Sequence, residues 1–159
     1  MEEEKKYYLT KEGLQKIRKE HEDLKKIKFT KTKGEAPKLL HSEDLNQEYL
    51  AFQEDMSFLE SRLVELDHIL KNTEFIKIPT KEKQNIIGLG ATVTLEERSG
   101  GINEFTIVGT LEANPAIGKI SNESPVGKTL LGHKRNDEVV ISSPIKIFYK
   151  IKKIKYNLS

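Results

Sequence analysis

The sequence contains no cysteine, and no stretch of it is apolar enough to span a membrane. The first absence excludes a disulfide framework and any zinc site built on thiolates. The second excludes a helical membrane span, and the opening residues Met-Glu-Glu-Glu-Lys-Lys are the opposite of a signal peptide. We therefore expect a cytoplasmic protein with no membrane partner.

The sequence also lacks a strong excess of one charge, because its formal net charge is only +2. That balance differs from the strongly basic profile of a protein that binds nucleic acids on its own. Charged residues make up 33% of the 159 residues and hydrophobic residues 36%. A large single core is therefore not expected, and an elongated or two-part molecule fits the composition better.

The strongest positive signal is a heptad pattern, which predicts a helix packed lengthwise on a partner. Its apolar or aromatic positions are Leu45, Tyr49, Phe52, Met56, Leu59, Leu63, Leu66 and Leu70. An upstream segment keeps the same rhythm at Leu14, Ile17, His21, Leu24 and Lys28. If the segments pack antiparallel with Leu14 opposite Leu70, the chain turns near Ser42, beside Glu43 and Asp44. The pattern thus predicts a helical hairpin with carboxylates at its far end.

Capping residues and helix breakers predict where these helices begin and end. Thr10 is a suitable N-cap for a first helix that runs to about Lys33, before Gly34 and Pro37. Ser42 is a suitable N-cap for a second helix that runs to about Asn72. The polar stretch after it reads as a linker. We expect a coiled-coil hairpin over residues 1–78, a linker over 79–85 and a second domain over 86–159.

The second domain shows the two-residue period of strands. Strands are predicted at Ala91–Leu95, Glu104–Val108 and Glu138–Ile141, and a long last strand starts at Ile145 with a bulge at Lys152-Lys153. Ser124 before Pro125 predicts a short helix that ends before Gly132. The expected fold class is α+β: an N-terminal antiparallel helical coiled-coil hairpin followed by a small, mainly antiparallel sheet domain with one short helix.

Two charged features have two interpretations each. Ser42-Glu43-Asp44 is a good helix start, where each acid near the N-terminus contributes roughly 0.3–1 kcal/mol, but the acids are also suitable metal ligands. An acid-free basic run near the end of the first helix is either a solvated helix face or a phosphate-contacting patch. Its members are Lys25, Lys26, Lys28, Lys31 and Lys33.

Several motifs resemble those of the GreA/GreB family of bacterial transcript-cleavage factors, and the resemblance extends from about residue 7 to residue 156. The most specific is the stretch Ser-Pro-Val-Gly-Lys-Thr-Leu-Leu-Gly at residues 124–132. Further motifs are Gly90-Ala-Thr-Val-Thr94, Phe105-Thr-Ile-Val-Gly109, Asp137-Glu-Val139, Asn46-Gln-Glu-Tyr49 and Tyr8-Leu-Thr.

The resemblance implies a non-enzymatic factor that binds bacterial RNA polymerase and stimulates the polymerase's own RNA cleavage. The protein would act as a monomer. Its FKBP-like C-terminal domain would dock at the rim of the polymerase's secondary channel, and its coiled coil would enter that channel. Glu43 and Asp44 would then be catalytic Mg2+ ligands shared with the polymerase active centre. The basic run Lys25, Lys26, Lys28, Lys31 and Lys33 would contact the 3′ end of the nascent RNA. The docking residues would be Ser124, Pro125, Val126, Gly127, Leu130 and Gly132.

The expected tip of the hairpin departs from the family pattern, which leaves alternatives open. In an ungapped match the two family acids fall on Ser42 and Leu45, so Glu43 and Asp44 lie between those positions. Adjacent residues on a helix point about 100° apart, which makes a poorer metal clamp. A regulator that occupies the channel without stimulating cleavage is therefore the alternative.

Two further functions fit the sequence less well. A peptidyl-prolyl isomerase or chaperone module would need an aromatic-lined pocket. The chain after the linker offers only Phe105, Phe148, Tyr149 and Tyr156 for it. A plain coiled-coil adaptor would leave the C-terminal domain unexplained.

Overall fold

The computed structural model describes residues 5–34, 47–142 and 145–156, which form two compact units. Residues Glu12–Thr73 make up the hairpin unit, and Lys5–Lys11 join Glu74–Ser159 in the sheet unit. Residues 5–11 thus contact the sheet unit, although the sequence assigned them to the hairpin. The expected domain boundaries and the linker at 79–85 stay predictions.

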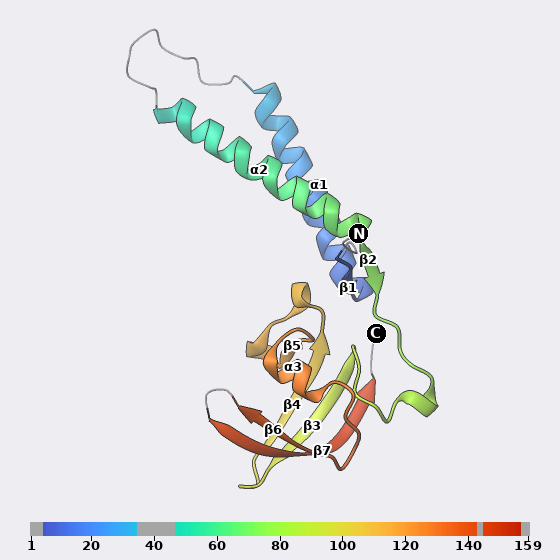
Figure 1. Ribbon diagram of the computed structural model, residues 1–159. Coiled ribbons are helices and arrows are strands. Elements are labelled where there is room, and N and C mark those ends of the chain that lie inside the picture. The colour runs from blue at the N-terminus through green and yellow to red at the C-terminus, as the bar shows by residue number, and fades with distance from the viewer. Residues whose placement is uncertain (1–4, 35–46, 143–144, 157–159) are drawn as a thin grey trace. The chain divides into compact units, whose positions relative to one another are not determined.

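The hairpin unit consists of α1 (Lys11–Lys33) and α2 (Gln47–Lys71), which lie antiparallel, side by side (Figure 1). The expected end of α1 is confirmed. Hydroxyl groups near it turn back onto the helix, since Thr30 Oγ1 donates to the carbonyl of Lys26 and Thr32 Oγ1 to that of Lys28. The expected start of the second helix at Ser42 lies outside the described residues.

The heptad positions form the buried seam between the two helices. Leu59, Leu63 and Leu66 are buried on α2, and Leu14 is buried on α1. Further along the seam, Tyr49, Phe52 and Met56 are half-buried. Full burial of a leucine contributes about 1.5–3 kcal/mol, so the seam stabilises the hairpin most strongly around Leu59–Leu66.

The sheet unit contains a five-stranded sheet with the order β5-β4-β3-β7-β6. All neighbouring strands are antiparallel except β4 and β5, which are parallel. The strands are β3 (Ala91–Glu97), β4 (Ile102–Val108), β5 (Lys119–Ser121), β6 (Glu138–Ser142) and β7 (Lys146–Tyr156). Helix α3 (Pro125–Leu130) covers one face, which we call the inner face. The described residues of this unit also include three short 3-10 helices, η1 (Lys81–Lys83), η2 (Thr110–Glu112) and η3 (Pro115–Ile117).

The core of the sheet unit lies between the inner face and α3. Val93, Leu95, Ile107 and Ile151 on the strands pack with Leu130 of α3, and each is fully buried. The predicted bulge is confirmed, because the register of β3 and β7 shifts between Thr94 and Leu95. The expected α+β class, with a helical hairpin before a mainly antiparallel sheet, is therefore confirmed.

A two-stranded sheet of β1 (Tyr7–Leu9) and β2 (Thr73–Phe75) was not expected. Leu9 is fully buried, and its carbonyl accepts a hydrogen bond from Ile76 N–H at 3.0 Å. The backbone of Tyr8 lies so close to Gly109 that a Cβ there would overlap the Tyr8 carbonyl oxygen. Separately, none of the described helices combines the length and hydropathy that a membrane span requires.

Candidate functional site

The acids predicted to hold a metal, Glu43 and Asp44, lie outside the described residues. Within residues 5–34, 47–142 and 145–156, no group of three or more His, Asp or Glu side chains could hold a metal ion. The Mg2+ assignment therefore stays a prediction that depends on the chemistry of the two carboxylates. Carboxylate oxygens are hard ligands, and Mg2+ commonly takes only one or two of them from a protein.

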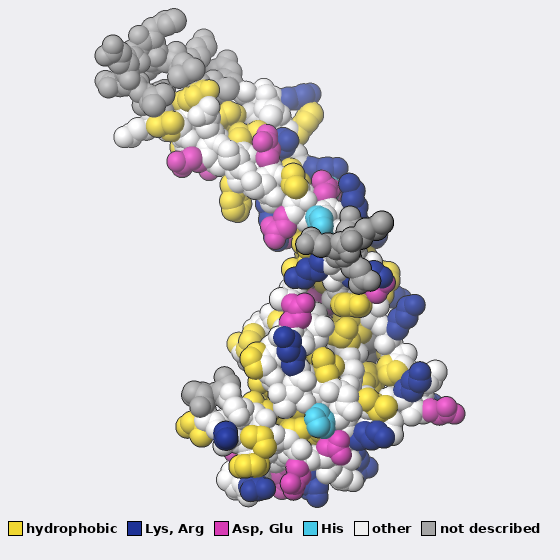
Figure 2. Space-filling view, viewed as in Figure 1, with side chains coloured by type: hydrophobic (Ala, Val, Ile, Leu, Met, Phe, Trp, Pro, Cys, Tyr) yellow, Lys and Arg dark blue, Asp and Glu magenta, His cyan; other side chains and the backbone are white. Residues whose placement is uncertain are grey.

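The basic run, which the structure does describe, lies on the last turns of α1. In Figure 2, dark blue side chains gather along the α1 side of the hairpin. The members differ in exposure, since Lys25, Lys26 and Lys33 are exposed while Lys28 and Lys31 are half-buried. Helical spacing explains the difference, because residues 28 and 31 continue the seam that Leu14 and His21 begin.

Ion pairs across the hairpin divide the lysines further. Lys31 Nζ lies 2.9 Å from Asp55 Oδ2, and Lys28 Nζ lies 3.8 Å from Glu60 Oε1. Among the described residues, neither Lys25 nor Lys26 has an acidic partner within ion-pair distance. Of the five lysines predicted to contact RNA, Lys28 and Lys31 are thus paired with carboxylates of α2, whereas the ammonium groups of Lys25 and Lys26 are not neutralised by an ion pair.

The fifth lysine has an aromatic partner. The Nζ atom of Lys33 lies 4.4 Å from the ring centroid of Phe29, which is a cation–π geometry. Phe29 itself is 58% exposed. An exposed aromatic ring beside lysines is a surface on which a nucleic-acid base could stack.

These side chains border a groove between α1 and α2 with a volume of about 1070 Å³. Phe29, Leu63 and Val64 supply apolar lining, and Lys25 and Lys26 supply positive charge. Acidic groups also line it, but Glu60 is near Lys28, and Asp67 Oδ1 lies 2.7 Å from His21 Nε2. The groove thus combines an apolar lining with the ammonium groups of Lys25 and Lys26, which form no ion pair among the described residues.

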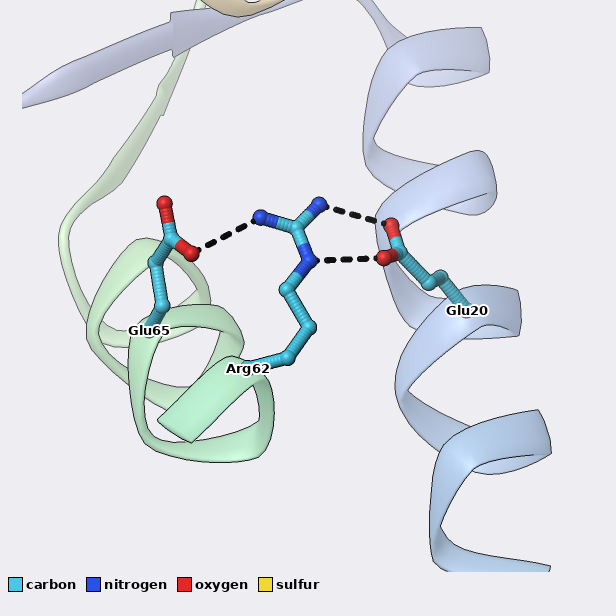
Figure 3. Close-up of polar contacts among 3 residues, drawn as sticks. All are labelled: Glu20, Arg62 and Glu65. Carbon is cyan, nitrogen blue, oxygen red and sulfur yellow. Dashed lines mark hydrogen bonds and ion pairs between the residues drawn. The ribbon is translucent and has the colours of Figure 1, made fainter. Parts of the chain in front are cut away.

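Arg62 connects the two helices of the hairpin (Figure 3). Its side chain reaches from α2 to α1, where Nε and Nη2 donate to the two Glu20 oxygens at 2.7 and 3.0 Å. Nη1 donates to Glu65 of its own helix at 2.9 Å. Hydrogen bonds to Glu20 and, to a lesser extent, to Glu65 raise the pKa of the guanidinium above its ordinary value. This bidentate contact between Arg62 and Glu20 helps to specify the register of the two helices.

The stretch predicted to dock on a partner forms the start of α3. Ser124 caps the helix, since its Oγ accepts from Gly127 N–H at 3.1 Å and donates to the carbonyl of Ser121 at 2.6 Å. Pro125 is exposed and Val126 half-buried, whereas Leu130 is fully buried in the core. Gly132, with φ of 84°, turns the chain after the helix and is exposed. Only part of the stretch can therefore face a partner.

Comparisons with known proteins bear on the whole chain. The family model "Transcription elongation factor, N-terminal" matches residues 7–74, and "Transcription elongation factor, GreA/GreB, C-term" matches residues 82–156. The chain belongs to the GreA/GreB family of transcription elongation factors. The resemblance inferred from the sequence and the role in transcription elongation are thus confirmed.

Curated GreA proteins match over most of their length. Transcription elongation factor GreA of Thermomicrobium roseum is 39% identical over 86% of this chain and 88% of its own. That of Bacillus subtilis is 41% identical over 91% and 92%. Among solved structures, GreA factor homolog 1 (Gfh1) of Thermus thermophilus is 28% identical, with coverage of 95% and 99% and a TM-score of 0.43.

Proposed function

We propose that this Gre factor binds RNA polymerase through the sheet unit and stimulates cleavage of backtracked nascent RNA with the far end of its hairpin. Glu43 and Asp44 would supply oxygen ligands to a Mg2+ in the polymerase active centre. When bound there, that ion would stabilise the charge of the attacking and leaving oxygens during phosphodiester cleavage. The chain would provide ligands and positioning, and the polymerase would perform the chemistry.

The observation that supports this proposal most directly is the division of the basic run. Lys28 and Lys31 pair with α2, whereas Lys25 and Lys26 are exposed beside the groove. Lysines without a carboxylate partner are available to phosphate oxygens, and Phe29 offers a face on which a base could stack. We therefore assign the RNA contact mainly to Lys25 and Lys26.

The tip sequence supports a second candidate, a regulator that occupies the secondary channel without stimulating cleavage. Glu43 and Asp44 stand between the two positions where the family pattern has acids. The two candidates share the polymerase contact and differ only in whether RNA is cut.

A cleavage assay on stalled, backtracked complexes of the source's own polymerase separates the candidates. With Mg2+ and the factor, we expect short 3′ RNA fragments that disappear with Glu43→Ala/Asp44→Ala while binding to the polymerase persists. Fragments that persist with this variant would refute the assignment of the two acids. No fragments with the unmodified factor, together with altered elongation, would instead establish the channel-occupying regulator.

The lysine assignment has a matched control on the same helix. Lys25→Gln/Lys26→Gln should raise the factor concentration needed for half-maximal cleavage about tenfold, since two phosphate contacts are lost. Lys28→Gln/Lys31→Gln removes the same charge but should mainly lower the stability of the hairpin. Equal losses of cleavage from the two variants, at a temperature where both are folded, would refute this division.

A further inference from the structure

The outer face of the sheet, opposite α3, carries a row of lysines that the proposed function does not use. The bulge in β7 creates it, because Lys152 is the extra residue between Ile151, paired with Leu95, and Lys153, paired with Thr94. Ile151 is buried on the inner face, while Lys152 and Lys153 are both exposed. The bulge thus resets the alternation of side chains and places consecutive lysines on one face.

Acidic neighbours neutralise one end of this outer face. Lys152 Nζ lies 2.8 Å from Glu96 Oε2 on β3. Lys150 stands directly opposite Glu138 of β6 in the strand register. At this end, positive and negative side chains alternate, so no strong field extends from it.

The other end of the outer face is different. Across β7, β3, β4 and β5, the register places Lys155, Thr92, Thr106 and Lys119 in one row, and Lys153 lies beside it. We call these five residues the lysine–threonine surface. The two hydroxyl oxygens in its centre, Thr92 Oγ1 and Thr106 Oγ1, are 2.9 Å apart.

The lysines of the lysine–threonine surface, Lys119, Lys153 and Lys155, form no ion pairs within the part of the chain that the structure describes. The neighbouring Lys155 side chain, and to a lesser extent Arg135, lower the pKa of the Lys153 ammonium, although Glu104, opposite Thr94, acts in the other direction. Like charges held this close favour the approach of an anion.

We propose that the lysine–threonine surface binds the phosphate backbone of duplex DNA without reading its sequence. Lysine and threonine side chains are typical donors to phosphate oxygens. The surface contains no aromatic side chain on which unpaired bases could stack, which disfavours a single strand. Its five side chains are not of the types that commonly read base edges, Arg, Asn and Gln, so the binding that we propose depends on charge.

This site is separate from the hairpin and from the cleavage chemistry. It uses strands β3, β4, β5 and β7 of the sheet unit, and none of its residues belongs to the basic run of α1. A factor that contacts duplex DNA near the polymerase would bind a transcribing complex more tightly than RNA polymerase without DNA. That gain would depend on salt, because each phosphate contact releases counterions.

The test is binding of the full-length protein to a short, fluorescently labelled DNA duplex of mixed sequence, measured by anisotropy. All proteins carry Lys25→Gln/Lys26→Gln, so that the hairpin contributes little. At about 50 mM salt, Lys153→Gln/Lys155→Gln should weaken binding about tenfold and reduce the salt slope by roughly 2. The matched control Lys150→Gln/Lys152→Gln removes the same charge from the same strand and should change affinity less than about twofold.

Lys119→Gln provides an independent variant on another strand, and it should also weaken binding. Thermal unfolding checks that each variant is folded, and Lys153→Arg/Lys155→Arg should retain binding. Equal effects of the test and control pairs would overturn the proposal, because only net charge would then matter. Tighter binding to single-stranded RNA, or equal lysine-dependent binding to polyglutamate, would overturn it in favour of another polyanion.

Discussion

Replacement of Gly127 by alanine should be one of the most damaging small substitutions in the sheet unit. A Cβ on Gly127 would overlap the carbonyl oxygen of Ser121 and would lie 3.1 Å from that carbonyl carbon and 3.2 Å from Asn122 Cα. These atoms belong to backbone, so no side-chain rotation can relieve the overlap. The same carbonyl oxygen accepts the Ser124 hydroxyl at 2.6 Å. Any backbone movement therefore also disturbs the cap of α3.

The two effects set the expected magnitude. Overpacking of a well-packed site costs about 1–3 kcal/mol, and loss of a serine cap costs about 0.5–2 kcal/mol. Partial relaxation makes a total of about 2–4 kcal/mol reasonable for the free energy of unfolding of the sheet unit. For a unit of this size, that corresponds to a fall in its melting temperature of roughly 10–25 °C.

Thermal unfolding followed by calorimetry measures this change, with Gly101→Ala as the matched control. A Cβ on Gly101 would meet only the flexible carboxyl of Glu97, at 3.4 Å. The control should therefore unfold within about 1 kcal/mol of the unmodified protein. If Gly127→Ala melted as high as the control, the close packing of α3 on the Ser121 backbone would be refuted.

Two further changes test individual polar contacts. Arg62→Lys should lower the stability of the hairpin unit by about 0.5–1.5 kcal/mol in denaturant unfolding, because lysine cannot reproduce the fork on Glu20; an unchanged midpoint would contradict this. For Asp137, the Lys134 N–H and then His133 lower the pKa of the carboxyl below its ordinary value of 3.8. Because the folded pKa is depressed, the stabilisation is present above 3.8 and is lost as the pH falls through the folded pKa. The difference in melting temperature between the unmodified protein and Asp137→Asn should therefore hold down to about pH 5 and shrink below it, and a constant difference would refute the reasoning.

Much of this fold could be predicted because the signals are local. The end of α1, the start of α3 at Ser124 and the bulge in β7 each follow from residues adjacent in the sequence. The heptad also predicted the burial of Leu59, Leu63 and Leu66 on α2, because the spacing of apolar residues determines the buried side. At the end of α2 it missed Ile69, which is buried, whereas the heptad position Leu70 is half-buried. Local capping and periodicity need no knowledge of distant parts of the chain.

Features that depend on distant residues could not be predicted in the same way. The pairing of β1 with β2 joins two three-residue segments with no distinct period. Likewise, the five lysines of the basic run look alike in the sequence. Only the register of the hairpin shows that Lys28 and Lys31 have partners on α2. The division of the candidate RNA contact is therefore information that the tertiary structure adds.

The position of Leu9 has a consequence for how the protein is made. Residues 5–11 leave the ribosome before the hairpin, yet they belong to a unit whose other residues are synthesised after Thr73. The sheet unit is discontinuous, and the hairpin is an insertion within it. The contacts of the hairpin join residues that are closer in sequence than Leu9 and the rest of the sheet unit. During translation the hairpin can therefore fold before the residues that bury Leu9 have been synthesised. A C-terminal fragment that starts at Glu74 would therefore lack β1. A chain in which a short linker replaces the hairpin between Lys11 and Glu74 would keep β1.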